Sequence, residues 1–184
     1  MCIRDSSGGK IVGLALGSSA GWPTKRWPVE SFRALAERLT RDLGCQVLLI
    51  GSSGEGDLAR EFDLNSEKVI NGIGETSLGE LVALIKQLSV LVTGDTAPLH
   101  IAAALGIPTV ALFGPTDPRR HVAEGNGTIV LSRRLPCQPC YSGSCKYSEH
   151  LACLKRIGVD EVLGAVQKQL NLEPLIEKKG TGLC

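Results

Sequence analysis

An aspartate, a threonine and a histidine stand where a buried strand is predicted to pass into a helix. The apolar run 90–94 leads into Asp95 and Thr96, and His100 follows in the next turn of an apolar segment. A short side-chain oxygen at Asp95 or Thr96 can cap the free N–H groups of such a helix, and Pro98 suits its first turn. A helix that begins at the carboxyl end of a parallel strand can bind a phosphate group. The same pattern fits an ordinary capped helix equally well.

Three further loops follow predicted strands and carry groups that suit an oxygen-rich ligand. They comprise residues 17–28, 51–57 and 114–118. Hydroxyls, backbone N–H groups and one lysine suit a pyrophosphate, and a carboxylate suits the diol of a ribose. The candidate side chains are Ser18, Ser19, Lys25, Glu55 and Thr116. Each also fits a duller role, such as a solvated lysine or a carboxylate at a helix start.

Four of the seven cysteines lie within one stretch of 17 residues. Cys137 and Cys140 have C-x2-C spacing, and Cys145 and Cys153 follow. Four thiolates, or three with the imidazole of His150, can complete a tetrahedral zinc site. An iron–sulfur centre or a redox pair is a second reading. Reduced thiols that tether a long loop without metal are the simpler alternative.

Apolar runs alternate with amphipathic segments along most of the chain. The predicted strands cover 11–16, 45–50, 69–70, 90–94, 109–113 and 128–131. The predicted helices cover 29–43, 58–64, 77–88, the segment that ends at Gly106, and 159–170. This alternation predicts an α/β fold with a doubly wound, mostly parallel sheet. Ligands bind such a sheet beyond the carboxyl ends of its strands, where the four loops above would meet.

Composition and motifs exclude several classes of protein. A formal net charge of +1 gives no reason to expect nucleic acid as a partner. No apolar run reaches the roughly 18 residues of a membrane span. The sequence has neither a G-x-G-x-x-G after its first strand nor a P-loop motif, which disfavours a dehydrogenase or a P-loop NTPase. Residues 1–10 lack the apolar core of a signal peptide and are interpreted as a disordered lead-in or an artefact, and 172–184 as a polar tail.

Three motifs resemble those of glycosyltransferase family nine, in the same order and at the same spacing. Residues 25–28 resemble the K-x-W-P element, and residues 95–108 resemble D-[ST]-x-x-x-H-x-A-x-A-x-x-x-P. Residues 113–118 match F-G-x-T-x-P. Members of this family have two Rossmann-like domains that face each other across a cleft, the GT-B fold. The resemblance implies that residues 11–171, with a cysteine-rich loop at 133–155, form the C-terminal, nucleotide-sugar-binding half.

The resemblance also implies roles in holding the diphosphate of the donor. Lys25 would neutralise the pyrophosphate, and the backbone N–H groups of Thr96 and Ala97 would donate to it. Ser18 and Ser19 lie where the family has small or hydroxyl residues near phosphate. The order of residues in this first loop departs from the usual family pattern, which puts its exact contacts in doubt but leaves Lys25 in place.

Other family positions would contact the rest of the donor. Glu55 would hold the ribose, and Thr76 and Ser77 lie where the family places residues beside the adenine. Asp95 and His100 would shape the turn and the sugar side of the site. No catalytic residue is expected in this chain, because the base of the family is an aspartate of the N-terminal half, which we expect to be absent here.

The cysteine-rich loop resembles that of family members that transfer heptose from ADP-heptose to the inner core of lipopolysaccharide. This implies ADP-heptose as the donor, no required cofactor, and a lipopolysaccharide acceptor held through the N-terminal half. It also implies a cytoplasmic location, with peripheral contact at the inner face of the inner membrane. Two alternatives stay open: a transferase for another nucleotide sugar, and a non-catalytic nucleotide-binding or metal-binding module.

Overall fold

A computed structural model describes residues 9–62, 66–122 and 127–171, so the predicted tail and nearly all of the predicted lead-in lie outside the described residues. The strands are β1 (Ile11–Ala15), β2 (Gln46–Ile50), β3 (Val69–Asn71), β4 (Val90–Gly94), β5 (Thr109–Phe113) and β6 (Thr128–Ser132). The α-helices are α1 (Val29–Asp42), α2 (Gly56–Ala59), α3 (Leu78–Ile85), α4 (Ala97–Leu105), α5 (Pro118–His121), α6 (Ala152–Lys155) and α7 (Val159–Asn171). Two 3-10 turns, η1 (Pro23–Lys25) and η2 (Ser53–Glu55), precede α1 and α2.

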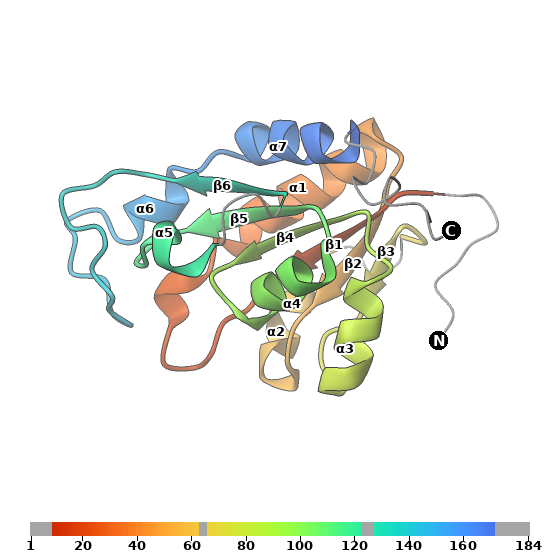
Figure 1. Ribbon diagram of the computed structural model, residues 1–184, viewed down its shortest axis with the longest axis horizontal. Coiled ribbons are helices and arrows are strands. Elements are labelled where there is room, and N and C mark those ends of the chain that lie inside the picture. Colours follow the sequence, from red (N-terminus) through yellow and green to blue (C-terminus); the bar gives the residue numbers. More distant parts are fainter. Residues whose placement is uncertain (1–8, 63–65, 123–126, 172–184) are drawn as a thin grey trace, which may run out of the picture.

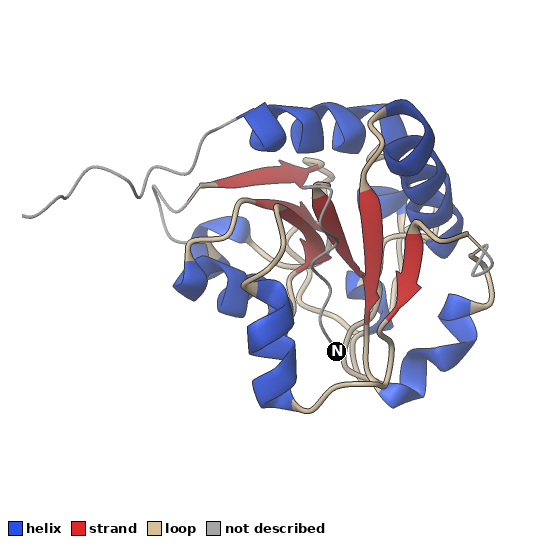
Figure 2. Cartoon of the chain, turned by 90° about the vertical axis from the view of Figure 1, so that its right-hand side faces the viewer, coloured by secondary structure: helices blue, strands red, loops and turns tan. Residues whose placement is uncertain are grey.

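The six described strands form one sheet in the order β3-β2-β1-β4-β5-β6, and every described pairing is parallel (Figure 1). The predicted doubly wound, parallel α/β fold is therefore confirmed. Its strands are apolar throughout because helices cover both faces of the sheet. In Figure 2 the sheet stands between two layers of helices.

Each face of the sheet packs against its own pair of long helices. On one face, α1 and α7 lie side by side and enclose a cluster that includes Phe32, Leu35 and Val166. On the other face, α3 and α4 pack on Leu91 and Ile50. Amphipathic helices gain most of their stability from such burial rather than from intrinsic propensity.

The strand order reverses between β1 and β4, which pair directly in the middle of the sheet. The chain leaves β1 toward α1 on one face and leaves β4 toward α4 on the other. The loops at the carboxyl ends of these two strands therefore separate and leave a crevice between them. In open α/β sheets this crevice is the usual position of a ligand.

Several predicted elements have different limits in the structure. The helix predicted at 58–64 is wrong in extent over the described residues, because α2 covers only Gly56–Ala59 after a 3-10 turn, and residues 63–64 lie outside the described part of the chain. The helix predicted at 77–88 ends at Ile85, and Leu78, its first residue, is 70% exposed. The loop 17–28 contains a 3-10 turn, and the cysteine-rich loop ends in α6.

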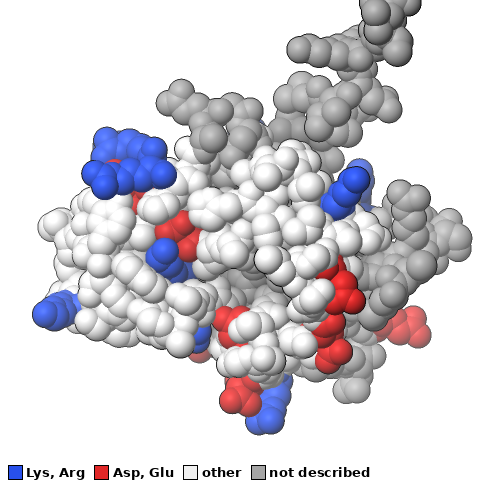
Figure 3. All heavy atoms as spheres, turned by 60° about the horizontal axis from the view of Figure 1, so that its bottom comes forward, with Lys and Arg blue, Asp and Glu red and all other residues white. Residues whose placement is uncertain are grey.

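The lengths of the helices and the distribution of charged side chains show how the surface is built. The longest described helices, α1 and α7, have 14 and 13 residues. None of the helices in the described part of the chain is both long and apolar enough to cross a membrane. On the face drawn in Figure 3, the described lysines and arginines form small separate groups with uncharged surface between them.

Candidate functional site

A pocket of about 390 Å³ opens at the carboxyl edge of the sheet, in the crevice between β1 and β4. Ala15 and Ile50, the last residues of β1 and β2, form part of its floor. Seven of the residues predicted to hold the donor line it: Ser18, Ser19, Glu55, Thr76, Ser77, Thr96 and Ala97. The structure therefore brings together side chains that lie up to 79 positions apart in the sequence.

The predicted residues Lys25, Asp95 and His100 form a second group rather than lining this pocket. Thr116 does not line it either, and its hydroxyl acts on the titration of Asp95. Lys25 Nζ donates to Asp95 Oδ2 at 2.8 Å, and the Asp95 side chain is only 4% exposed. The ammonium also lies 4.8 Å from the centroid of the Trp22 ring. The proposed capping role of Asp95 is wrong, because its carboxylate is committed to this ion pair instead of to α4.

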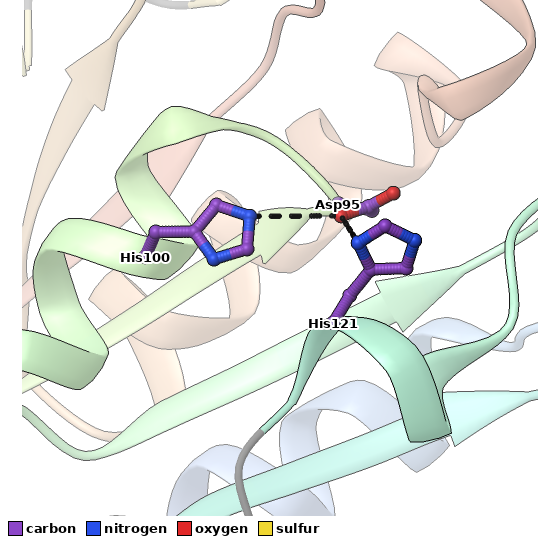
Figure 4. Close-up of side chains that lie close together, drawn as sticks. All are labelled: Asp95, His100 and His121. Carbon is purple, nitrogen blue, oxygen red and sulfur yellow. Dashed lines mark ion pairs between the residues drawn. The ribbon is translucent and has the colours of Figure 1, made fainter.

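Two imidazoles face the same carboxylate from two different helices (Figure 4). His100 Nε2, from α4, lies 3.9 Å from Asp95 Oδ1, and His121 Nδ1, from α5, lies 3.6 Å from it. Burial acts to raise the pKa of Asp95, but the Lys25 ammonium, the Thr116 hydroxyl and the His121 ring outweigh it and hold that pKa below its usual value. The carboxylate is therefore anionic at neutral pH.

His121 is a site residue that the sequence analysis missed. It belongs to the four-residue helix α5, which is too short to show a periodic pattern. One ring nitrogen of His121, one of His100 and one carboxylate oxygen of Asp95 all lie within 4.8 Å of one another. The Lys25 ammonium already pairs with the Asp95 carboxylate. The cluster of Asp95, His100 and His121 is therefore poorly suited to bind a further cation.

Glu55 closes one end of the pocket through a compact set of hydrogen bonds. Its Oε2 accepts from the backbone N–H and the hydroxyl of Ser52, at 2.8 and 3.1 Å, as part of a capping box. Its Oε1 faces Arg26 Nη2 at 3.7 Å. A Cβ at Gly17 would lie 1.6 Å from Glu55 Oε1, so the carboxylate packs directly on that glycine.

Arg26 is a second residue that the sequence analysis missed. Its guanidinium donates to the Ser18 hydroxyl at 3.0 Å and to the Ser18 carbonyl at 2.8 Å, besides facing Glu55. It thus ties the loop after β1 to the loop after β2. The K-x-W-P motif predicts a role for the neighbouring Lys25. The role of Arg26 follows only from its contacts with Ser18 and Glu55 in the folded protein.

The start of α4 presents one free donor to the pocket. Thr96 is the N-cap residue, but its N–H donates to Gly94 O at 2.9 Å and its hydroxyl contacts the Thr93 hydroxyl at 3.1 Å. Among the hydrogen bonds of the described residues, the N–H of Ala97 has no acceptor. Pro98, which follows, has no N–H, so Ala97 is the donor in place for an anion.

The opposite wall of the pocket is the start of α3. Ser77 caps this helix, accepting from Glu80 N at 3.4 Å while Glu80 Oε2 accepts from Ser77 N at 2.8 Å. Leu78 and Leu81 add an apolar surface beside Thr76. An exposed leucine next to a polar pocket is suited to cover the face of a flat ring.

The four clustered cysteines lie away from this pocket, around a second cavity of about 340 Å³. Cys137 and Cys140 are exposed, Cys145 is half-buried and Cys153 is buried. The described part of the chain holds a single group of three or more close ligand atoms, that of Asp95 and the two histidines, so no three sulfurs lie mutually within 4.8 Å. All four are free thiols.

A parallel sheet of this order, with a pocket of hydroxyl and backbone donors at its switch point, is the architecture of nucleotide-binding domains. Comparison with known families identifies which family of nucleotide-binding proteins the chain belongs to. Residues 4–151 match the model of glycosyltransferase family 9 (heptosyltransferase), and the chain belongs to this family.

Curated and solved relatives agree with this assignment. The chain is 40% identical to lipopolysaccharide heptosyltransferase 2 of Salmonella typhimurium over 118 residues, which cover 61% of this chain and 33% of that protein. It is 34% identical to lipopolysaccharide heptosyltransferase 1 of Pseudomonas aeruginosa, covering 68% and 35%. The structure of Escherichia coli ADP-heptose lipopolysaccharide heptosyltransferase II matches with a TM-score of 0.72 and 28% identity, over 90% of this chain and 47% of that one. The chain thus spans about a third of the length of these two curated relatives.

Proposed function

We propose that this chain is the donor-binding part of a heptosyltransferase and that its donor is ADP-heptose. The pocket at the switch point carries the proposal, because it gathers seven predicted donor-binding residues beside the Lys25–Asp95 pair. The relatives support the choice of sugar and nucleotide, since a matched structure is described as an ADP-heptose heptosyltransferase. In this arrangement the adenine lies against Leu78 and Leu81, and the ribose near Glu55.

The chain's own residues would act on the leaving group. Heptosyl transfer breaks the bond between the anomeric carbon and a phosphate oxygen of ADP, while a new bond forms to an acceptor oxygen. Negative charge then collects on the departing diphosphate. The Lys25 ammonium and the Ala97 N–H, at the positive end of α4, would stabilise that charge. Asp95 would keep Lys25 in place between turnovers.

The acceptor and the proton transfer require groups beyond those described here. A base must take the proton of the acceptor hydroxyl as the new bond forms. Relatives in this family are longer than the region matched by this chain. We assign the base, and the surface that binds lipopolysaccharide, to the part of those proteins outside the matched region. The chain alone would then bind donor and ADP without transferring heptose, and the assembled enzyme would act at the cytoplasmic face of the inner membrane.

Calorimetric titration with nucleotides tests the donor. ADP is expected to bind, with UDP and GDP at least about tenfold weaker, because the proposed donor is ADP-heptose, the nucleotide sugar named for a matched relative. Equal affinity for the three nucleotides would point to a different donor class. Lack of ADP binding at millimolar concentration would contradict the proposed function.

Lys25→Ala provides the matched variant for this titration. Loss of a charge-assisted hydrogen bond of about 1.5–3 kcal/mol predicts a roughly 10- to 100-fold weaker affinity for ADP. Lys10→Ala is the control, because Lys10 is exposed and precedes β1, at the opposite edge of the sheet. Unchanged ADP affinity in Lys25→Ala would favour a non-catalytic nucleotide-binding module.

A further inference from the structure

The adjacent cations Lys25 and Arg26 extend to opposite sides of the crevice. Lys25 Nζ bonds the Asp95 carboxylate, in the loop after β4, at 2.8 Å. Arg26 instead bonds Ser18, in the loop after β1, through Nε and Nη2. The backbone leaves η1 and becomes extended at Arg26, with φ −87° and ψ 123°, which separates the two side chains. In the proposed function only Lys25 has a role so far.

The Ser18 hydroxyl is an anchor for Arg26 rather than a free donor. Ser18 Oγ donates to Trp22 O at 2.6 Å and accepts from Arg26 Nε at 3.0 Å. A serine hydroxyl has one proton, so its contact with Trp22 leaves none for a ligand. The Ser18 carbonyl accepts from Arg26 Nη2 at 2.8 Å, which completes a two-point contact with the planar fork of the guanidinium. Arg26 is therefore held in one position next to the pocket.

Glu55 has one carboxylate oxygen bonded within the protein and one without a hydrogen bond. Oε2 accepts from Ser52, whereas Oε1 has no hydrogen-bond donor among the described residues. Arg26 Nη2 lies 3.7 Å from Oε1, which is close enough for attraction and too far for a hydrogen bond. The lone pairs of Oε1 are thus free for a ligand, beside a positive charge that is fixed in place.

The Glu55 carboxylate has little room to turn. Its side chain is only 8% exposed. A Cβ at Gly17 would lie 1.6 Å from Oε1, and a Cβ at Gly51 would lie 3.0 Å from Oε2. The carboxylate is thus packed between the loops after β1 and β2. Without Arg26, its free oxygen would be a mostly buried anion with no opposite charge within 4.0 Å in the described part of the chain.

We propose that Arg26 is a positioning residue, which holds Glu55 Oε1 in place to accept hydrogen bonds from the hydroxyls of a ribose. This rests on the proposed function, in which Glu55 contacts the ribose. A carboxylate oxygen fixed in this way accepts from the 2′-hydroxyl, and a 2′-deoxyribose leaves it unsatisfied. Loss of a hydrogen bond to a charged group weakens binding roughly 10- to 100-fold. Arg26 thus sets the preference for ribonucleotides over 2′-deoxyribonucleotides.

Calorimetric titration of the full chain with ADP and with 2′-deoxy-ADP tests this role. The wild type is expected to prefer ADP by at least about tenfold. In Arg26→Gln we expect this ratio to fall to about threefold or less. Arg26→Lys keeps the charge and loses the planar fork, so its ratio should lie between the two. Arg33→Gln is the matched control, since Arg33 is an exposed arginine of α1 that faces Glu37 and Glu61, and it should keep the wild-type ratio.

Two other roles for Arg26 give different results in the same titrations. An arginine that only braced the two loops would, when lost, weaken both nucleotides equally, and an unchanged ratio would overturn the proposal. An arginine that bound the diphosphate directly would, when lost, lower the preference for ADP over AMP. That result, with an unchanged ratio of ADP to 2′-deoxy-ADP, also overturns it. If circular dichroism shows that Arg26→Gln does not fold, Arg26→Lys carries the comparison, with a lower ratio than the wild type as the expected result.

The titrations separate this proposal from the choice of donor. If the wild type bound UDP or GDP in place of ADP, the proposed donor would be wrong. The ratio measured for that nucleotide and its 2′-deoxy form would still test Arg26. If the wild type bound ADP and 2′-deoxy-ADP equally, the positioning of Glu55 would be wrong while the donor stood. A wild type that bound none of these nucleotides would contradict both proposals.

Discussion

Asp95 carries a charge inside the protein and has three basic neighbours. Lys25 is hydrogen-bonded to one oxygen, and His100 and His121 face the other. A hydrogen bond to a charged partner contributes about 1.5–3 kcal/mol, whereas an unpaired buried carboxylate costs more than that. The pair therefore stabilises the fold and also keeps a lysine ready beside the pocket.

This pair predicts a specific loss of stability in acid. The pKa of Asp95 in the folded protein lies below its ordinary value, so the unfolded chain binds the extra proton first as pH falls. The stabilisation is fully present above the ordinary value, near pH 4, and is lost as pH falls through the lower, folded-state pKa. Urea unfolding of wild type and Asp95→Asn checks this: the gap between them should shrink from pH 6 to about pH 2.5. A gap that is constant over this range would contradict the assignment.

Gly17 offers a steric test at the other end of the site. An alanine methyl would lie 1.6 Å from Glu55 Oε1, so Glu55 must leave its hydrogen bonds with Ser52. We expect Gly17→Ala to lower the free energy of unfolding by about 1–3 kcal/mol, measured by urea denaturation. Gly21→Ala, in the same loop, meets no atom within 4 Å and serves as the control. Equal stability of the two variants would argue against the packed position of Glu55.

At the scale of elements, the end of α4 depends on a left-handed residue. Gly106 has φ +69°, a conformation that strains any residue with a Cβ. Gly106→Ala is expected to cost about 1 kcal/mol in the free energy of unfolding. Gly164→Ala is the opposite case, because Gly164 lies within α7 facing open space, and should gain about 0.5–1 kcal/mol. Thermal and urea unfolding of both variants check the difference in sign.

The sequence predicted long elements well and short ones poorly. All six described strands were located within one or two residues, because continuous apolar runs bounded by glycine mark buried parallel strands. Helices α5 and α6 were missed, since four residues are too few to show a helical period. The helix at 58–64 was overextended, because apolar residues in a short segment can pack on the core without continuing a helix.

The sequence predicted those site residues that combine a suitable polar group with a position in a loop directly after a strand. Loops at the carboxyl ends of parallel strands must converge, so Ser18, Glu55 and Thr96 were placed together correctly. Arg26 and His121 were not, because their roles depend on contacts with Ser18 and Asp95 that no local pattern records. Membership of the family is shown by the comparisons, whereas the roles of single residues in binding the donor stay predictions.

At the scale of the whole molecule, a pocket, an ion pair and a cavity lie along one edge of the sheet. The pocket lies between β1 and β4, the Lys25–Asp95 pair lies beside it, and the cysteine cavity lies at the end of β5. This arrangement agrees with the proposed role of the chain in binding a donor.

A crystal structure of this chain with ADP would test the central claim most directly. We predict that the diphosphate lies in hydrogen-bonding distance of Lys25 Nζ and Ala97 N, with the adenine against Leu78. Lys25 would then turn from Asp95 toward the phosphate or contact both. ADP bound outside the pocket between β1 and β4, or a diphosphate with no contact to Lys25 and Ala97, would contradict the account.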